Sequence, residues 1–440
     1  MNKRSIIELV IIFTVTLIIN LTWLNFSLDE IWSFGFSYNI SQGLIPYKDF
    51  NMVIFPFYPI LNGIIMSLFG TNYLVFEITN AIICTAIFYY LKKLSPKNYY
   101  VLFILLLPIS YGNYSLLCLL LTLMIITLEQ KEPKNHMLIG LLIGLLFITK
   151  QNIGIIFILL TIYLYYKEPK IILKRLLIFC LPFLCTIIYL LLTNSVSSFI
   201  NYTILGLFDF SEKNTALSSY TIAIITLTIY IIYRYFYKKD KQIILMYSLV
   251  SLTQNYPLFD QYHFIISIIP ISIYILNRIK IPNYYLKLSF NIVIISLLTM
   301  TSYQIITDQK IIPNHTNNFK YKALTPYQDE IITTINNYIQ SIPPTTYLFI
   351  LDSSAYLYKI ENNIDINKYD LINNGNMGYH GEQTYQKEII DICHKKDCLF
   401  LINNYEFFTK RNQTNQHLLN YVINNYQYTE KIGNLYAYKN

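Results

Sequence analysis

Long apolar segments, separated by short polar loops, run through the first 306 residues of the chain. Segments of roughly 18 or more apolar residues are long enough for an α-helix to cross a ~30 Å hydrocarbon core. Shorter ones, such as 137–149 and 152–166, are expected to tilt or to cross the bilayer incompletely. The pattern predicts an α-helical polytopic membrane protein with about eleven transmembrane helices. The predicted segments are 5–24, 72–91, 98–111, 113–129, 137–149, 152–166, 171–193, 219–237, 242–257, 264–277 and 288–306.

One further apolar segment, 55–70, differs from the others because it contains Pro56 and Pro59. Proline lacks a backbone donor and interrupts a helix interior, so we expect a re-entrant or interfacial helix here. If this segment does span, its neighbour 72–91 does not, because the charge pattern described below requires an odd number of crossings there.

The last part of the chain, residues 307–440, is polar and rich in asparagine, and it has no apolar segment long enough to span a bilayer. Short apolar runs typical of buried strands alternate in it with stretches of helical periodicity. This alternation predicts a small C-terminal α/β domain after a transmembrane domain at 1–306. Strands are expected at 346–351, 398–402 and 434–438, and helices at 327–340 and 385–392.

The composition also indicates a membrane protein. Hydrophobic residues make up 54% of the chain and charged residues only 13%, whereas soluble domains carry about 25% charged residues. The net charge of +8 would also fit a protein that binds nucleic acid. Most basic residues, however, lie in short loops between apolar segments, where they set membrane topology. We therefore expect a lipid bilayer, and no nucleic acid, as a partner.

The loop charges predict the orientation of the chain. Eighteen basic residues fall on one side of the predicted membrane and three, Lys48, Lys150 and Lys213, on the other. Because basic residues concentrate on the cytoplasmic side, the N-terminus is expected in the cytoplasm and the C-terminal domain is expected to be extracytoplasmic. The first segment has no small-residue cleavage site and is interpreted as a signal anchor in the plasma membrane. The predicted cytoplasmic residues are Lys3, Arg4, Lys92, Lys93, Lys97, Lys131, Lys134, Lys167, Lys170, Lys174, Arg175, Arg234, Lys238, Lys239, Lys241, Arg278, Lys280 and Lys287.

The six cysteines divide into two groups. Four lie in apolar segments and are expected to be small buried hydrophobic residues; they are Cys84, Cys118, Cys180 and Cys185. Cys393 and Cys398 lie in the polar tail, where an external location favours a local disulfide. A zinc site would need two more ligands, and only His394 is near, so no metal site is predicted there.

Unusual polar residues collect at the predicted external ends of the helices. Ionisable side chains beside membrane segments are costly and often functional, and the adjacent acids Asp29-Glu30 follow the first predicted span directly. The other external candidates are Tyr47, Lys48, Asp49, Lys150, Gln151, Asp209, Glu212, Lys213, Asp260 and His263. This concentration predicts a site for a polar substrate at the membrane surface.

The chemistry that fits such a site is sugar transfer from a polyprenyl-phosphate carrier. Asp29 is the candidate general base that removes the acceptor's proton. Lys150, with Lys48 as the second candidate, would bind the leaving phosphate, on which charge develops in the transition state. Asp260 and His263 would orient the acceptor or the phosphate.

Structural explanations remain for the same residues. Asp29-Glu30 can mark the start of an interfacial helix, whose dipole favours acids. Asp49 can close a turn, and Lys150 can extend towards lipid headgroups. Asp260 with His263 can belong to a solvated loop. His380, in a glycine-rich stretch of the tail, either belongs to an ordinary loop or helps to cover an acceptor site.

The order of residues in the first external loop resembles that of GT-C membrane glycosyltransferases. An Asp-Glu pair is followed by Gly-x-x-Pro-Tyr-x-Asp-Phe, Pro-x-x-Pro and Leu-Phe-Gly, and the resemblance is greatest to the protein-mannosyltransferase-like branch that includes lipid A aminoarabinose transferases. The residues that carry this order are Asp29-Glu30, Gly43, Pro46-Tyr47, Asp49-Phe50, Pro56, Pro59 and Leu68-Phe69-Gly70, together with Gly144 and 149–154. The strong resemblance covers about 27–154, and the rest of the chain matches in layout only. No counterpart of the arginine-rich phosphate clamps of some relatives is found.

This resemblance implies that Asp29, with Glu30 beside it, is the essential carboxylate. The residues expected to bind the substrates follow from their external position and chemistry instead; they are Tyr47, Lys48, Asp49, Lys150, Gln151, Asp260 and His263. The resemblance also implies a polyprenyl-phosphate-linked sugar donor, and the acceptor would be a glycan, lipid or protein of a bacterial cell envelope. The sequence does not decide between no cofactor and a divalent cation. The rival functions are a transporter or flippase of lipid-linked sugars and an envelope polysaccharide polymerase or ligase.

Overall fold

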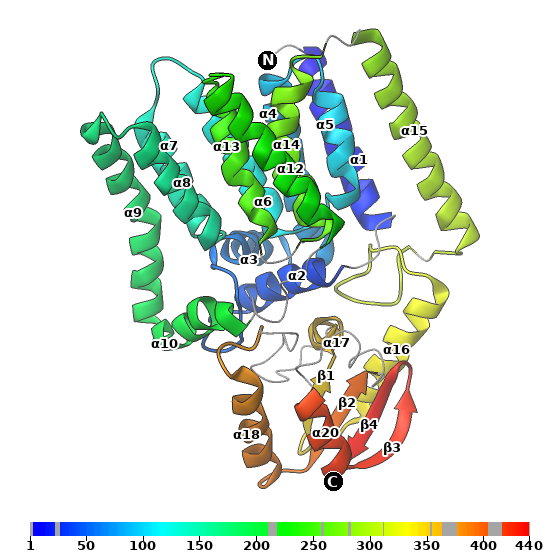
Figure 1. Cartoon of the computed structure of the whole chain (residues 1–440). Helices are drawn as coiled ribbons and strands as arrows, with labels where there is room; N and C mark the ends of the chain where they lie inside the picture. Colours follow the sequence, from blue (N-terminus) through cyan, green and yellow to red (C-terminus); the bar gives the residue numbers. More distant parts are fainter. Residues whose placement is uncertain are drawn as a thin grey trace.

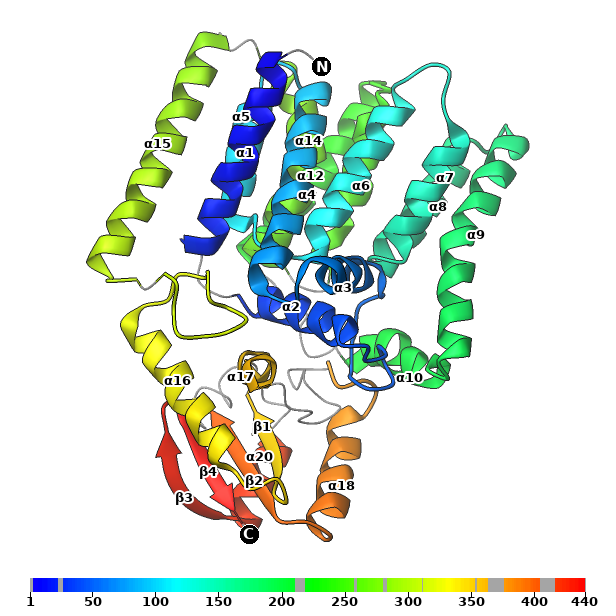
Figure 2. The same cartoon turned by 180° about the vertical axis from the view of Figure 1, so that it is seen from behind.

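A bundle of helices occupies one end of the molecule and a small domain with a β-sheet occupies the other (Figure 1). The computed structural model describes residues 3–22, 27–209, 218–256, 259–279, 283–310, 312–352, 354–362, 376–403 and 416–439. The N-terminus lies at the end of the bundle remote from the small domain, in which the chain ends. The same division is visible from behind (Figure 2).

Each of the eleven predicted segments overlaps one helix of the bundle, so the mostly helical fold is confirmed. Short 3-10 turns follow α5 as far as Ile109 and α13 as far as Asn255, and a π-helical turn follows α12 as far as Tyr237. The bundle helices are α1 Lys3–Thr22, α4 Tyr73–Leu94, α5 Tyr99–Leu106, α6 Tyr114–Glu129, α7 His136–Phe147, α8 Gln151–Leu164, α9 Pro169–Leu192, α12 Ser219–Ile232, α13 Ile243–Leu252, α14 Gln261–Leu276 and α15 Asn283–Thr307.

Helix length and exposed surface both fit a membrane environment. Within the described residues, α1, α4, α9 and α12 with its extension are long and apolar enough to cross a membrane. The other bundle helices are shorter, except α15, which has 25 residues. About eleven crossings therefore remain a prediction. On α9, four residues at helical spacing are each more than half exposed: Leu177, Leu181, Leu184 and Ile188. An apolar stripe of this kind fits contact with hydrocarbon.

The predicted burial of the four apolar cysteines is correct for two of them. Cys84 and Cys118 are buried, whereas Cys180 is partly exposed and Cys185 is exposed. The prediction is wrong for the last two because both lie on α9, which has few buried residues. An apolar segment alone does not distinguish the packed side of a helix from its lipid-facing side.

Two glycines let α7 and α9 pack closely. A Cβ atom on Gly140 would lie 2.6 Å from the backbone oxygen of Arg175, and one on Gly144 would lie 2.7 Å from that of Phe179. Any larger residue at either position would push the two helices apart. Small residues four positions apart commonly allow such contacts between helices in membranes.

A buried ion pair joins α6 and α9 at the end of the bundle remote from the small domain. Nη1 of Arg175 lies 2.6 Å from Oε1 of Glu129, and neither side chain is exposed. The hydroxyl groups of Tyr165 and Tyr247 donate hydrogen bonds to the same carboxylate at 2.7 and 2.9 Å. Arg175, which the sequence placed among cytoplasmic loop charges, is therefore enclosed between helices and ties four of them together.

Two short helices, α2 Leu28–Ser41 and α3 Phe57–Phe69, lie across the end of the bundle that faces the small domain (Figures 1 and 2). α3 agrees with the interfacial helix expected for 55–70. At the start of α2, the Ser27 side chain accepts the Glu30 N–H at 3.1 Å, and the Glu30 carboxylate accepts the Ser27 N–H at 3.2 Å. This capping box fixes where α2 begins.

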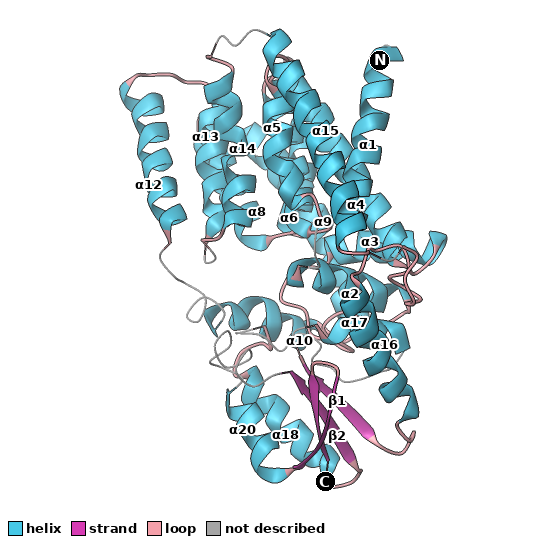
Figure 3. Cartoon of the chain, turned by 90° about the vertical axis from the view of Figure 1, so that its right-hand side faces the viewer, coloured by secondary structure: helices cyan, strands magenta, loops and turns pink. Residues whose placement is uncertain are grey.

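The C-terminal domain contains a β-sheet, coloured magenta in Figure 3, whose four strands have the order β1-β2-β4-β3 (Figure 1). β1 Tyr347–Leu351 and β2 Cys398–Asn403 are parallel, while β4 Leu435–Lys439 pairs antiparallel with β2 and with β3 Gln427–Ile432. The described helices of this domain are α16 Pro326–Ser341, α17 Ala355–Asn362, α18 Gly381–Cys393 and α20 Gln416–Asn425.

The three predicted strands and two predicted helices of this domain are confirmed, whereas β3, α17 and α20 were not predicted. Cys393 and Cys398 form the expected disulfide, with their Cα atoms 5.6 Å apart. The domain packs on α2 through Tyr356 of α17. A Cβ atom on Gly35 of α2 would lie 2.4 Å from the Tyr356 ring, so only glycine permits this contact.

Candidate functional site

Asp29 lies in the first turn of α2, next to the junctions between several bundle helices. The charged groups that act on its carboxyl group are His263, Asp260 and Lys150, which come from two other places in the chain. Burial raises the pKa of Asp29 above its usual range, while the charges of His263 and Lys150 oppose this rise and that of Asp260 adds to it. The structure therefore brings together four of the residues predicted to form the site.

Asp260 and His263 form a compact pair at the start of α14. Oδ1 of Asp260 accepts the backbone N–H of His263 at 2.8 Å, and Nδ1 of His263 lies 2.9 and 3.0 Å from the two carboxylate oxygens. Burial alone would raise the pKa of Asp260, but the hydrogen bond and charge of His263, with a contribution from Lys150, hold it below its usual range. Asp260 therefore stays ionised at pH values where Asp29 takes up a proton. Carboxyl groups whose pKa values are shifted apart are typical of sites that divide acid and base roles.

Lys150 lies at the junction of α7 and α8. Its Nζ is 5.6 Å from the centre of the Tyr114 ring, and the charges of Asp29 and Asp260 both act on it. The ion pairs found among the described residues do not include Lys150. Its ammonium group can therefore meet an added anion without first breaking an ion pair.

Four residues of the site were not predicted from the sequence: Tyr111, Asn113, Tyr114 and Tyr262. Asn113 caps α6 by accepting the Ser115 N–H at 2.8 Å, and its side chain also hydrogen-bonds Asp29. The hydroxyl of Tyr262 is buried and has no hydrogen-bond partner among the described residues. The polar turn 110–113, which lies between two apolar segments, is the sequence signal that could have indicated Tyr111, Asn113 and Tyr114. Tyrosine itself carries little signal in a chain that contains 42 of them.

Glu30 does not join this group, although it is adjacent to Asp29 in the sequence. Its carboxylate is fully buried, caps α2 and accepts a hydrogen bond from the hydroxyl of Tyr73. Nζ of Lys322, from the polar tail, lies 3.5 Å from the same carboxylate. These are the contacts of a residue that fixes the helix start, and a catalytic role for Glu30 stays a prediction.

The remaining predicted substrate-binding residues have local partners or face solvent. The buried Tyr47 donates a hydrogen bond to the backbone oxygen of Ile54 at 2.7 Å, and Asp49 closes a turn by accepting the Ile45 N–H at 2.7 Å. Nε2 of Gln151 donates to the backbone oxygen of Thr203 at 3.2 Å, and Lys48 is exposed. Their contact with substrate stays a prediction.

The loop that contains His380 connects the two parts of the molecule. Its backbone N–H donates to the carboxylate of Asp209 at 3.0 Å, and the N–H of Tyr379 donates to Oδ1 of Asn201 at 3.2 Å. The loop around His380 thus docks on the segment that follows α10 Val196–Ile200. Two other external candidates, Glu212 and Lys213, lie outside the described residues.

No group of three or more His, Cys, Asp or Glu side chains arranged to hold a metal ion is found among the residues that the structure describes. A carboxyl group with a raised pKa can exchange a proton, a partly buried lysine can attract an anion, and the Asp260–His263 pair can accept or donate hydrogen bonds. Such a set suits the transfer of a group from a donor, whose leaving group is anionic, to the hydroxyl group of an acceptor.

No family model matches the chain, and no curated protein matches its sequence. Among solved structures, the chain is similar to ArnT from Cupriavidus metallidurans bound to undecaprenyl phosphate, at 10% identity and a TM-score of 0.58. It is similar to the apo state of the same protein at 9% identity and a TM-score of 0.59. Each alignment covers 99% of this chain and 97% of the other. The chain therefore has the fold of ArnT over almost its whole length.

Proposed function

We propose that this protein is a GT-C membrane glycosyltransferase that transfers a sugar from a polyprenyl-phosphate donor to a cell-envelope acceptor. The reaction takes place at the outer face of the bacterial plasma membrane. The observation that carries the proposal is the convergence of Asp29, Lys150, Asp260 and His263, which lie at the starts of α2, α8 and α14. Helix α2 lies at the end of the bundle nearest the C-terminal domain (Figure 1). The ArnT fold, crystallised in one case with undecaprenyl phosphate, supports a lipid phosphate as the carrier.

In the proposed reaction, the hydroxyl oxygen of the acceptor attacks the anomeric carbon of the sugar. The bond between that carbon and the phosphate oxygen breaks, and the phosphate keeps the bonding electron pair. The proton of the acceptor passes to the carboxylate of Asp29, whose raised pKa makes it a stronger base than an ordinary aspartate. The products are the glycosylated acceptor and polyprenyl phosphate.

Lys150 and the Asp260–His263 pair have separate parts in this proposal. The ammonium group of Lys150 stabilises the negative charge that grows on the leaving phosphate. Asp260 holds His263 in a fixed orientation through Nδ1, so that its other ring nitrogen can hydrogen-bond the acceptor or the phosphate. The position of these groups at helix ends supports an enzyme over a transporter, which would place them in broken helices near mid-membrane.

The decisive experiment measures the release of polyprenyl phosphate from a panel of polyprenyl-phosphate sugars by the purified protein in lipid nanodiscs. Asp29→Asn should lower this release by about 10²–10⁴-fold, because an amide cannot accept the proton, while binding of undecaprenyl phosphate persists. Asp391→Asn, the same change at an exposed site on α18, is the control and should leave release unchanged. Near-normal release by Asp29→Asn would reject Asp29 as the base. Movement of donor lipid across the bilayer without release would instead indicate a flippase.

A further inference from the structure

Lys322 belongs to the segment that leads into the C-terminal domain, yet its side chain ends among the bundle helices and is only 2% exposed. Its Nζ lies 2.6 Å from the backbone oxygen of Asn20, 3.5 Å from Oε1 of Glu30 and 3.4 Å from the hydroxyl oxygen of Tyr73. These three oxygens belong to the last turn of α1, the first turn of α2 and the first residue of α4. One ammonium group thus joins three elements of the membrane domain.

The C-terminal domain holds Lys322 in this position through a tight loop. The carboxylate of Glu361 in α17 accepts the N–H groups of Asn317 and Asn318, each at 2.7 Å. Nδ2 of Asn314 donates to the backbone oxygen of Lys322 at 2.6 Å. The ring of Phe319 packs against those of Phe34 and Tyr73, with centres 5.2 and 5.7 Å apart. The loop is therefore built from the C-terminal domain and seated on α2 and α4.

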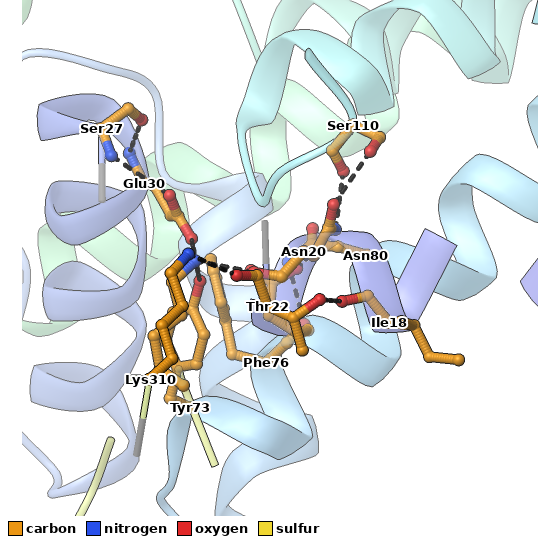
Figure 4. Close-up of polar contacts among 12 residues, drawn as sticks. Ile18, Asn20, Thr22, Ser27, Glu30, Tyr73, Phe76, Asn80, Ser110 and Lys310 are labelled. Carbon is orange, nitrogen blue, oxygen red and sulfur yellow. Dashed lines mark hydrogen bonds and ion pairs between the residues drawn. The ribbon is translucent and has the colours of Figure 1, made fainter. Parts of the chain in front are cut away.

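Lys322 helps to hold Glu30 in place, and Glu30 in turn fixes the helix turn that carries Asp29. The Glu30 carboxylate is held by Ser27 and Tyr73 (Figure 4) and by Lys322. These contacts define the first turn of α2, in which Asp29 is the preceding residue. If Lys322 were withdrawn, Glu30 would remain buried without a cation. An uncompensated buried charge is strongly destabilising, so the first turn of α2 would have to rearrange and carry Asp29 with it.

A second connection supports Asp29 through Asn20. The side chain of Asn20 donates to the backbone oxygen of Ser110 at 2.9 Å and accepts the Ser110 hydroxyl at 2.9 Å (Figure 4). It also donates to Glu77 at 2.7 Å. Ser110 begins the turn that contains Asn113, whose side chain hydrogen-bonds Asp29. The helix turn that carries Asp29 and the loop that supplies its hydrogen-bond donor therefore both rest on groups that Lys322 binds.

We infer that Lys322 is a positioning residue, which couples docking of the C-terminal domain on the bundle to the orientation of the Asp29 carboxylate. The inference rests on the proposed function only for the consequence that transfer depends on this coupling. The coupling itself is a property of the fold and can be measured without any substrate.

The test compares Lys322→Met with Lys310→Met in the full chain by hydrogen–deuterium exchange. Lys310 is a matched control, because it lies in the same segment and its Nζ also binds a backbone oxygen at the end of α1, that of Thr22 at 2.9 Å. Lys322→Met should speed exchange at 27–34 and at 110–114 by about tenfold or more, since it leaves Glu30 unpaired. Lys310→Met should not, and β2 should stay protected in both variants. Unchanged exchange at 27–34 in Lys322→Met would overturn the inference.

The double variant Glu30→Gln with Lys322→Met guards against simple loss of folding. Removing both partners of a buried pair is tolerated better than removing one, so the double variant should exchange no faster at 27–34 than Lys322→Met alone. Strictly additive effects would mean that Lys322 does not act through Glu30 and would overturn the inference.

Transfer provides the last readout. Lys322→Met should lower kcat about tenfold with little change in the Kd for undecaprenyl phosphate, because Asp29 is misplaced while Lys150 is intact. Faster exchange with an unchanged kcat would reduce Lys322 to a structural anchor and overturn its positioning role. If the unmodified protein transferred no sugar at all, the proposed function would fail, and the exchange comparison would still decide whether the coupling exists.

Discussion

The rings of Tyr111 and Tyr262 stack with their centres 5.2 Å apart and their planes at 28°. Tyr262 is 8% exposed, and its hydroxyl lacks a hydrogen-bond partner among the described residues. Leaving a buried hydroxyl unpaired costs about 1–3 kcal/mol, a cost that a polar group of a substrate would remove. The stacked pair therefore presents a hydrogen-bonding group beside Asp29.

Tyr262→Phe should keep the stacking and remove only the hydroxyl. We expect the variant to melt at the same temperature or higher, because an unsatisfied buried polar group is lost. If the hydroxyl binds substrate, the KM for donor or acceptor should rise about 5- to 30-fold, as the loss of a neutral hydrogen bond worth about 1–2 kcal/mol would produce. A lower melting temperature with an unchanged KM would assign Tyr262 to packing alone.

The raised pKa of Asp29 predicts how activity and stability respond to pH. Since the base must be ionised, kcat/KM should fall on the acid side at a pH above that of an ordinary aspartate, for which the pKa is about 3.9. Because its folded-state pKa lies above its unfolded value, the folded state binds the extra proton. Asp29 therefore lowers the free energy of unfolding progressively as the pH rises from its pKa in the unfolded state to its pKa in the folded state.

Asp29→Asn removes this cost, so the variant should melt no lower than the unmodified protein at neutral pH while losing activity. Thermal melting and a pH–rate profile measure the two effects. A marked drop in melting temperature would show that the ionised carboxylate supports the fold instead.

Lys150→Met removes a charge and keeps most of the side-chain length. If Lys150 meets the donor phosphate, the variant should bind undecaprenyl phosphate about tenfold or more weakly and melt normally, because charged hydrogen bonds contribute about 1.5–3 kcal/mol. Loss of thermal stability without loss of binding would identify Lys150 as a structural partner of Asp29 or Asp260. If neither quantity changes, Lys150 does not belong to the site.

Arg175→Met should destabilise the bundle by about 3–5 kcal/mol, because it leaves Glu129 buried without its cation. The double variant Glu129→Gln with Arg175→Met should recover much of this loss. Thermal melting in detergent compares the two. A single variant as stable as the unmodified protein would mean that the tyrosine hydroxyl groups suffice to hold Glu129.

Membrane topology can be tested with single cysteines at exposed positions. A cysteine in place of Lys320, on the C-terminal side, should react with an impermeant thiol reagent in intact cells, as the distribution of basic residues predicts. A cysteine in place of Lys97, at the opposite end, should react only after the membrane is broken. The reverse pattern would place the C-terminal domain in the cytoplasm and remove the external site.

The sequence by itself determined the helices of the bundle and the location of Asp29. A helix that crosses the hydrocarbon core of a bilayer needs a long apolar segment. Because such a segment is continuous in the sequence, each of the eleven could be recognised from its own residues. The sides of the membrane follow from the same segments, because successive helices end at alternate sides. For this reason Asp29, Lys150, Asp260 and His263 could be assigned to one face although more than 200 residues separate the first from the last.

Only the tertiary structure showed that Asp29 and Glu30 have different surroundings. Successive residues of a helix point about 100° apart, so the two acids face different surroundings: one meets Lys150, Asp260 and His263, and the other meets Lys322, 292 residues away. Strand β3 was missed because five of its six residues are exposed, which leaves no apolar pattern to detect. Tertiary packing brings such distant residues together, and the sequence around each of them does not predict the contact. The position of a charge along the chain could be predicted, but the group that neutralises it could not.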